Sequence, residues 1–187
     1  IFIANGHTED NIHLRDKSTA YRARNLVLRN DGTGHFARIS QASNSGLLPE
    51  ASSRGAAFGD LDNDGDIDAV VLNSRQPPTV IRNETNNANH WFQVRVKGII
   101  ANRDGVGTQI TVTSGGVSRT AEVHSGRGYQ SHYGSRVHFG LGRRQVIDLI
   151  VIRWLGGGES IFEDIPADRA VLARQDSEQL AFRGGTR

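Results

Sequence analysis

Apolar and polar residues alternate along most of the second half of the chain, as a half-buried β-strand requires. Gly-rich or polar turns separate the alternating segments, which are HWFQVRVKG, TQITVTS, SRTAEVHS, SRVHFGLG, VIDLIVIRW and ESIFEDI. None of them has convincing helical periodicity, although ADRAVLARQ allows a short helical turn. The pattern predicts an all-β domain over residues 89–175, either a β-sandwich or a partly closed barrel. Residues 176–187 are polar and predict a C-terminal strand or tail.

Two stretches of the first half are similar in sequence. NLVLRNDGTGHF (25–36) resembles PTVIRNETNNANHW (78–91), and IFIANG (1–6) aligns with DAVVLNS (68–74). Each unit therefore reads as strand, loop, strand and Arg-Asn turn, and the first carries the insertion HTEDNIHLRDKSTAY. Repeats of short strands at this spacing indicate a propeller or a solenoid. We expect residues 1–88 to form incomplete propeller blades, with the chain beginning in the middle of a repeat.

A run of alternating aspartates, DLDNDGDID, precedes the strand of the second repeat. It places carboxylates at Asp60, Asp62, Asp64, Asp66 and Asp68, with Gly65 at the bend. Calcium takes about six to eight oxygen ligands in a flexible shell, so oxygens at alternate positions can wrap around it. We expect Asp66 to offer its backbone carbonyl and the other aspartates their carboxylates.

The spacing also indicates which kind of calcium loop this is. A helical calcium loop needs Glu at its last ligand position, and that position is Val71, within a β-type run. The sequence therefore predicts a strand–loop–strand calcium site. The alternatives are an acidic surface turn and a magnesium site, although magnesium prefers fewer carboxylates and more water.

The motifs of both halves resemble known families. RGAAFGDLDNDGDIDAVVLN, with Phe58-Gly59, resembles the FG-GAP/VCBS calcium-loop repeats that form β-propeller blades in integrin-like and bacterial surface proteins. NHWFQVRVKG, NRDGVGTQITVTSGG, SGRGYQSHYGSRVHFGLG and VIDLIVIRWLGGGESIFEDIPAD resemble the ASPIC/UnbV domain of secreted acidic cartilage protein and its bacterial relatives. The resemblance implies an extracellular or cell-surface location and no catalytic activity. Such repeats normally complete a propeller, and here barely one and a half are present.

Two further turns carry oxygen ligands. In NRDGVG, Asn102 and Asp104 could form a weak second metal site, or they belong to an ordinary turn between strands. In NDGTG, Asn30 and Asp31 have the same two interpretations, and we favour the turn in both places because Asn, Asp and Gly are turn formers.

Two surface features bear on partners. Tyr129 and Tyr133 lie in a Gly/Ser-rich loop and are candidates for glycan contacts. Asn83 begins an Asn-Glu-Thr glycosylation sequon, which matters only in a compartment with that machinery.

Composition and charge restrict the remaining classes. The net charge is +2 and no basic stripe with interleaved aromatic residues is present, which argues against nucleic acid. The sequence has no apolar run of membrane-spanning length, no HExxH motif and no GxSxG motif. The predicted function is an extracellular calcium-binding structural or adhesion module that contacts other protein chains, extracellular matrix or glycans. A filament or surface-layer subunit that assembles with its own copies by strand exchange, and a glycan-binding accessory domain, are the alternatives.

Overall fold

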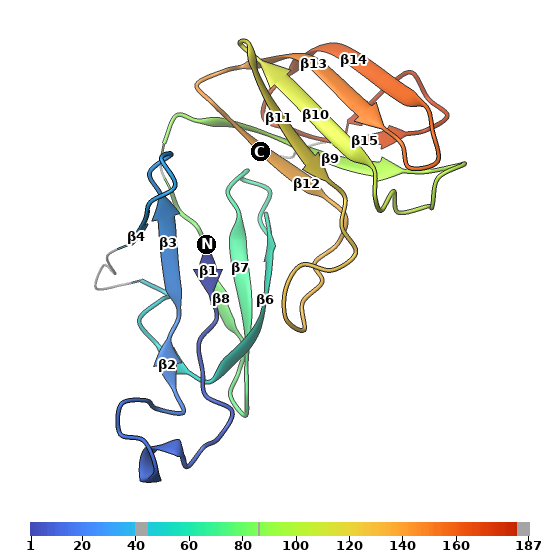
Figure 1. The fold of residues 1–187 in the computed structure, drawn as a ribbon. Helices are drawn as coiled ribbons and strands as arrows, with labels where there is room; N and C mark the ends of the chain where they lie inside the picture. Colours follow the sequence, from blue (N-terminus) through green and yellow to red (C-terminus); the bar gives the residue numbers. More distant parts are fainter. Residues whose placement is uncertain (40–44, 86, 183–187) are drawn as a thin grey trace. The chain divides into compact units, whose positions relative to one another are not determined.

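The computed structural model describes residues 1–39, 45–85 and 87–182, in which β-strands dominate (Figure 1). The helical element among these residues is a single 3-10 turn, η1 (Ile12–Leu14), so the predicted all-β class is confirmed. The chain divides into two compact units, each described here by itself. Unit 1 comprises Ile1–Leu61, Asp66–Glu84 and Arg127–Tyr133; unit 2 comprises Asp62–Gly65, Thr85–Gly126 and the residues from Gly134 onward.

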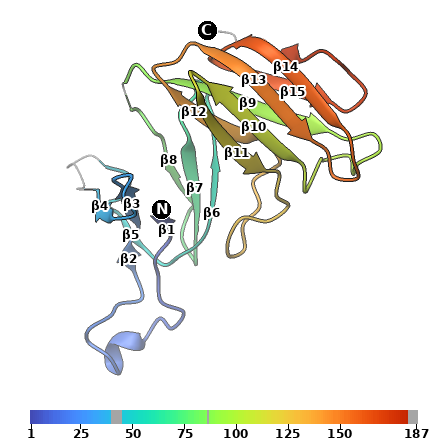
Figure 2. The ribbon, with the colours of Figure 1, turned by 45° about the horizontal axis from the view of Figure 1, so that its top comes forward.

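Unit 2 contains two four-stranded sheets, ordered β11-β10-β13-β14 and β12-β9-β15-β16. Neighbouring strands are antiparallel, except for the parallel pair β9 and β15. The strands are β9 (His90–Lys97), β10 (Gln109–Ser114), β11 (Val117–Glu122), β12 (Val137–Gly142), β13 (Val146–Arg153), β14 (Glu159–Pro166), β15 (Arg169–Arg174) and β16 (Ala181–Phe182). Figure 2 shows the two sheets layered one over the other.

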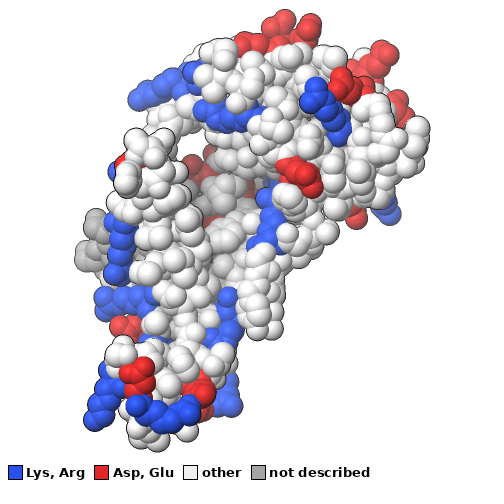
Figure 3. Space-filling model, in the orientation of Figure 1, with Lys and Arg blue, Asp and Glu red and all other residues white. Residues whose placement is uncertain are grey.

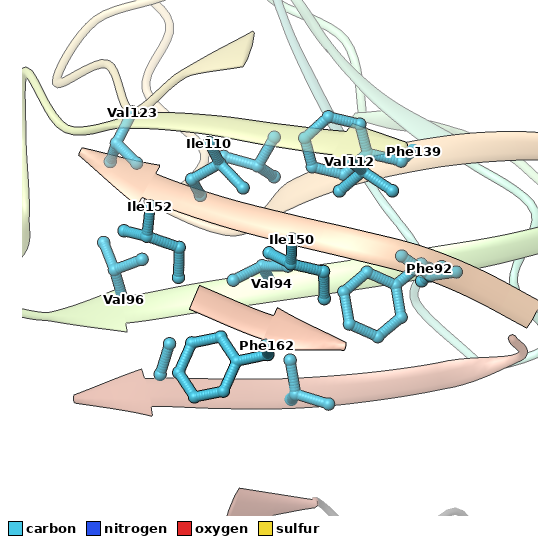
Figure 4. Close-up of a cluster of buried hydrophobic side chains, with 14 of the residues drawn as sticks. Phe92, Val94, Val96, Ile110, Val112, Val123, Phe139, Ile150, Ile152 and Phe162 are labelled. Carbon is cyan, nitrogen blue, oxygen red and sulfur yellow. The ribbon is translucent and has the colours of Figure 1, made fainter. Parts of the chain in front are cut away.

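The core of unit 2 lies between these sheets. Phe92 and Val94 of β9 face Ile110 of β10 and Ile150 of β13, and all four side chains are 0% exposed (Figure 4). Alternate residues of the longer inner strands supply most of this core, because successive side chains of a strand point to opposite faces. Neither sheet closes on itself among the described strands. Of the two architectures that the sequence allowed, unit 2 therefore has the sandwich.

The segment ADRAVLARQ was expected to allow a helical turn, and this expectation is wrong. It contains the strand β15, which pairs in parallel with β9 so that Val171 lies opposite Val94. Val171 and Ala173 alternate into the core and are almost completely buried. A short apolar run fits either conformation, and the pairing with β9 selects the strand. The predicted C-terminal region contains β16; residues 183–187 lie outside the described residues.

Unit 1 contains two three-stranded sheets, ordered β1-β3-β4 and β6-β7-β8, and the short pair β2–β5. The strands are β1 (Phe2–Ile3), β2 (Ala23–Arg24), β3 (Leu26–Asn30), β4 (Phe36–Arg38), β5 (Glu50–Ala51), β6 (Ser53–Gly59), β7 (Asp68–Asn73) and β8 (Thr79–Ile81).

The two sheets of unit 1 repeat the same hairpin in the same register. Phe2 of β1 pairs with Val27 of β3, and the residues aligned with them by sequence, Val70 and Val80, pair in β7 and β8. The two sheets are in contact through Phe2 and Phe58, whose rings meet edge to face at 5.4 Å. The sequence repeat is therefore a structural repeat of propeller type.

The burial of Ile150 predicts its contribution to stability. We expect Ile150→Ala to lower the free energy of unfolding by about 2–5 kcal/mol, since truncation leaves a cavity in a packed core. The matched change Ile100→Ala, at a residue that is 84% exposed, should cost less than about 0.5 kcal/mol. Denaturant unfolding followed by tryptophan fluorescence measures both, because Trp91 and Trp154 belong to unit 2. Equal losses in the two variants would contradict the assigned core.

Candidate metal site in the acidic loop

The acidic loop connects two antiparallel strands. β6 ends at Gly59, which pairs with Asp68 at the start of β7. Val71 lies inside β7, so the segment after the loop is a strand and the predicted strand–loop–strand arrangement is present. Asn63 and Gly65 have positive φ angles of 63° and 96°. These left-handed residues bend the chain back within the loop, and Asn and Gly adopt this conformation more readily than other residues.

The loop brings three of its carboxylates together. One oxygen each from Asp60, Asp62 and Asp68 lies within 4.8 Å of the others. Asp60 is 9% exposed and Asp68 is 2% exposed, whereas Asp62 is open to solvent. Buried like charges at this distance repel each other strongly, and an oxygen-only donor set is what hard divalent cations prefer. These residues therefore fit a calcium ion.

Asp68 is held in place by two backbone amides. The amide of Leu61 donates to its Oδ2 at 2.9 Å, and the amide of Asn83 donates to its Oδ1 at 2.8 Å. A carboxylate oxygen has two lone pairs, so each oxygen retains capacity for an ion. The two amides fix the orientation of the carboxylate. Sequence reasoning did not identify them, and their one sequence signal is the repeated Arg-Asn turn that contains Asn83.

The remaining aspartates of the loop have other placements. The amide of Asp64 donates to Oδ1 of Asp62 at 3.3 Å, which closes a local turn inside the loop. Asp64 and Asp66 are not among the three aspartates that the loop brings together. The ligand role of Asp64 and the carbonyl role of Asp66 stay predictions.

The two weaker oxygen sites have the contacts of ordinary turns. The side-chain amide of Asn102 donates to the Val106 carbonyl at 2.8 Å, and its Oδ1 accepts the Val106 amide at 2.9 Å; Asp104 is exposed. In the other turn, Asp31 accepts hydrogen bonds from the hydroxyl and the amide of Thr33, which hold the pKa of Asp31 below its ordinary value. The side chains of Asn102 and Asp31 thus form hydrogen bonds within their own turns.

The glycan and glycosylation candidates lie apart from the aspartates in the sequence. Tyr129 is 70% exposed. Tyr133, in unit 1, packs edge to face on Phe58 at 5.5 Å, and the guanidinium of Arg127 lies over its ring at 5.6 Å. Tyr133 therefore offers less free ring surface than Tyr129 for stacking on a sugar. Asn83 is half-buried, and its backbone serves Asp68.

These features define a class of protein: propeller-type repeats with an acidic loop, followed by a β-sandwich. Residues 12–71 match the family model of the FG-GAP-like repeat, and residues 98–180 match the family model described as ASPIC and UnbV. The chain therefore carries an FG-GAP-like repeat followed by an ASPIC/UnbV domain, as its motifs indicated. No curated protein matches the chain.

The two families place the chain in a biological context. Both domains are typical of extracellular or surface proteins, and FG-GAP repeats often mediate protein interactions and commonly bind calcium. Among the described residues, no helix has the length and apolar character needed to cross a bilayer.

The contacts of Asp68 distinguish a structural role from a ligand role. We expect Asp68→Ala to destabilise the protein by about 1–3 kcal/mol even without metal, because the amides of Leu61 and Asn83 lose their acceptor. Asp104→Ala, at an exposed position outside the cluster, should change the metal-free stability by less than about 0.5 kcal/mol. Thermal unfolding in chelator measures both, and an unchanged melting temperature for Asp68→Ala would contradict the assigned bonds.

Proposed function

We propose that this protein is an extracellular structural or adhesion module that calcium stabilises and that has no catalytic activity. The observation that carries the proposal is the cluster of Asp60, Asp62 and Asp68, whose carboxylate oxygens lie within 4.8 Å of one another. Asp60 follows β6 and Asp68 begins β7, so an ion held by both ties together the ends of two strands. Bound calcium supplies charge neutralisation there, with no chemical step.

Extracellular calcium suits such a site. Calcium sites of extracellular modules have dissociation constants of roughly 10⁻⁴ to 10⁻³ M. A ligand that binds only the folded state stabilises it by mass action. Where calcium is plentiful, the ion would then stabilise the ends of β6 and β7, whose sheet buries few apolar side chains.

The contacts of His90 support the part of the proposal that assigns no catalytic activity, because they hold two strands together. His90 Nδ1 and Asp168 Oδ2 are 2.7 Å apart, and Asp168 Oδ1 also accepts the Trp91 amide at 3.2 Å. The Asp168 amide donates to the Trp91 carbonyl at 2.8 Å. These contacts join the start of β9 to the start of β15, a role in which a His–carboxylate pair holds strands in register.

Calcium should raise the melting temperature. With about 1 mM calcium and a dissociation constant near 10⁻⁴ M, mass action adds about 1.4 kcal/mol of stability, or a few degrees. Asp62→Ala should remove most of this response, whereas Asp104→Ala, in the turn near Asn102, should keep it. Thermal unfolding with calcium and with chelator tests the proposal. Superimposable curves for the unaltered chain would refute calcium binding.

A second candidate function, assembly with other copies of the chain, is supported by the outer faces of unit 1. Because residues alternate along a strand, Leu72 and Val80 project from the face of β6-β7-β8 opposite to that of Phe58 and Val71. They are 56% and 62% exposed. In the repeat, this face corresponds to the face of β1-β3-β4 that carries Phe2. That face already packs against the sheet β6-β7-β8, through the contact between Phe2 and Phe58.

The opposite outer face of unit 1 is complementary to it. Ile1, Ile3 and Phe36 are exposed on the side of β1-β3-β4 away from Phe2. Packing this face on the Leu72 and Val80 face of another copy would repeat the contact already made inside unit 1. Such a head-to-tail contact joins two different surfaces, so it continues into a filament unless the rotation closes a ring. In this candidate, the strand exchange predicted from the sequence is replaced or supplemented by face packing.

Substitution of one outer face tests this candidate. Leu72→Lys with Val80→Lys should give a monomer, because two charges replace the apolar contact, while Ile100→Lys on unit 2 should leave assembly unchanged. Light scattering and electron microscopy with calcium present measure the assembly. If the unaltered chain is monomeric at high concentration, assembly with its own copies is excluded.

A further inference from the structure

Both sheets of unit 2 end along one side of the sandwich. β14 is the last strand of the sheet β11-β10-β13-β14, and β16 is the last strand of β12-β9-β15-β16. Among the described strands, β14 pairs only with β13 and β16 only with β15. Every second residue of an edge strand points its N–H and C=O groups away from the sheet. This side therefore presents unpaired backbone groups along β14 between Glu159 and Glu163, before the left-handed Asp164.

A groove of about 580 Å³ runs between these two edges. Phe162 of β14 and Leu180, which precedes β16, pack against the core and form its apolar floor. Ile161 and Phe182 line the same groove and are 55% and 50% exposed. The groove therefore combines apolar surface with an open strand edge.

The edge of β14 has little protection against strand addition between Glu159 and Glu163, whereas the left-handed Asp164, with a φ of 54°, interrupts the edge beyond that point. Proteins blunt exposed edges with Lys, with Pro or with a covering segment. The sequence of β14, ESIFEDIP, has no Lys or Arg, and its Pro stands at the last position. A regular open edge of this kind can pair with an extended segment of another chain.

The charge along the groove selects the partner. Glu163 and Glu178 line it, both are exposed, and no basic side chain of the described residues forms an ion pair with either. Glu159, at the other end of β14, differs because Arg153 contacts it at 2.6 Å. Acidic side chains gather along the top of the view, over β13 and β14 (Figure 3). This negative rim contrasts with the net charge of +2 of the whole chain.

We propose that the groove between β14 and β16 binds an extended, basic segment of a partner protein, which adds to β14 as a further strand. Its Lys or Arg side chains would lie on the face of β14 that carries Ile161 and Glu163, with their charged ends near Glu163 and Glu178. Its alternate apolar side chains would enter the groove toward Phe162 and Leu180. The backbone pairing supplies affinity, and the alternation of charge and apolar residues supplies specificity. This site belongs to unit 2 and does not depend on calcium in the acidic loop.

The test uses two synthetic peptides with the full chain. In one peptide Arg and Val alternate over ten residues, and in the other Glu and Val alternate. We expect the Arg peptide to bind, measured by fluorescence anisotropy, with an affinity that falls as salt rises. Binding of both peptides with equal affinity would overturn the charge assignment, and no binding of the Arg peptide at millimolar concentration would overturn the site.

Paired variants locate the site. The double change Glu163→Gln and Glu178→Gln should weaken binding of the Arg peptide about three- to tenfold, as the loss of two exposed ion pairs predicts. Glu122→Gln is the matched control, because Glu122 lies on β11, the edge strand at the opposite end of the same sheet. Equal weakening in the control, or none in the double variant, overturns the proposal. Unchanged thermal unfolding of each variant establishes that it is folded.

Two further measurements test whether the peptide pairs with β14 and whether the chain's own last residues compete for the groove. Bound peptide should slow amide hydrogen exchange and shift amide NMR signals in residues 159–166, and Ile161→Lys should weaken binding by protecting the edge. Changes confined to other strands would overturn strand addition. A chain shortened after Phe182 should bind the peptide as the full chain does. If only the shortened chain binds, the chain's own last residues are the occupant and the partner proposal is wrong.

Discussion

The buried carboxylate of Asp68 makes the interactions on which the acidic-loop end of unit 1 depends. It begins β7, accepts the amide of Leu61 from the loop, and accepts the amide of Asn83 from the segment after β8. One side chain thus determines where the loop closes and where the repeat ends. The same side chain stands in an acidic cluster with Asp60, where burial makes repulsion between charges costly. Asp68 therefore serves the fold and also belongs to the cluster that fits a cation.

The strand pattern of the chain was largely predictable, because each strand that buries one face imposes alternation on its own residues. The repeat was predictable even to its register, since the sequence alignment of IFIANG with DAVVLNS places Phe2 at the position of Val70, and both pair as the alignment requires. β15 was not predictable from local sequence. Its conformation depends on parallel pairing with β9, in which Val171 meets Val94 from a distant part of the chain. No feature of the segment ADRAVLARQ itself indicates that it pairs with β9.

The acidic loop shows a different limit of sequence reasoning. Strict alternation places five carboxylates on one side only if the chain stays extended. The left-handed residues Asn63 and Gly65 bend the chain between Asp62 and Asp66, so the loop groups Asp60, Asp62 and Asp68 instead of the whole series. The sequence identified the loop in which three carboxylates meet. The sequence alone could not show which of the five aspartates lie together. Their positions depend on the turn at Asn63 and Gly65. They also depend on the backbone amide of Asn83, which lies near Asp68 only because β8 pairs with β7.

The two units leave different kinds of surface uncovered, and the difference has thermodynamic consequences. The outer faces of unit 1 are apolar sheet surfaces, whose association is driven by removal of apolar area from water and so weakens on cooling. The open side of unit 2 offers backbone hydrogen bonds and an acidic rim, whose attraction for a basic segment is directional and weakens with salt. Of the two proposed interfaces, the one through unit 1 would therefore respond mainly to temperature, and the one through unit 2 mainly to ionic strength. In the proposed module, Glu163 belongs to an interface that salt would weaken, and Leu72 belongs to an interface that cooling would weaken, so the two would be regulated independently.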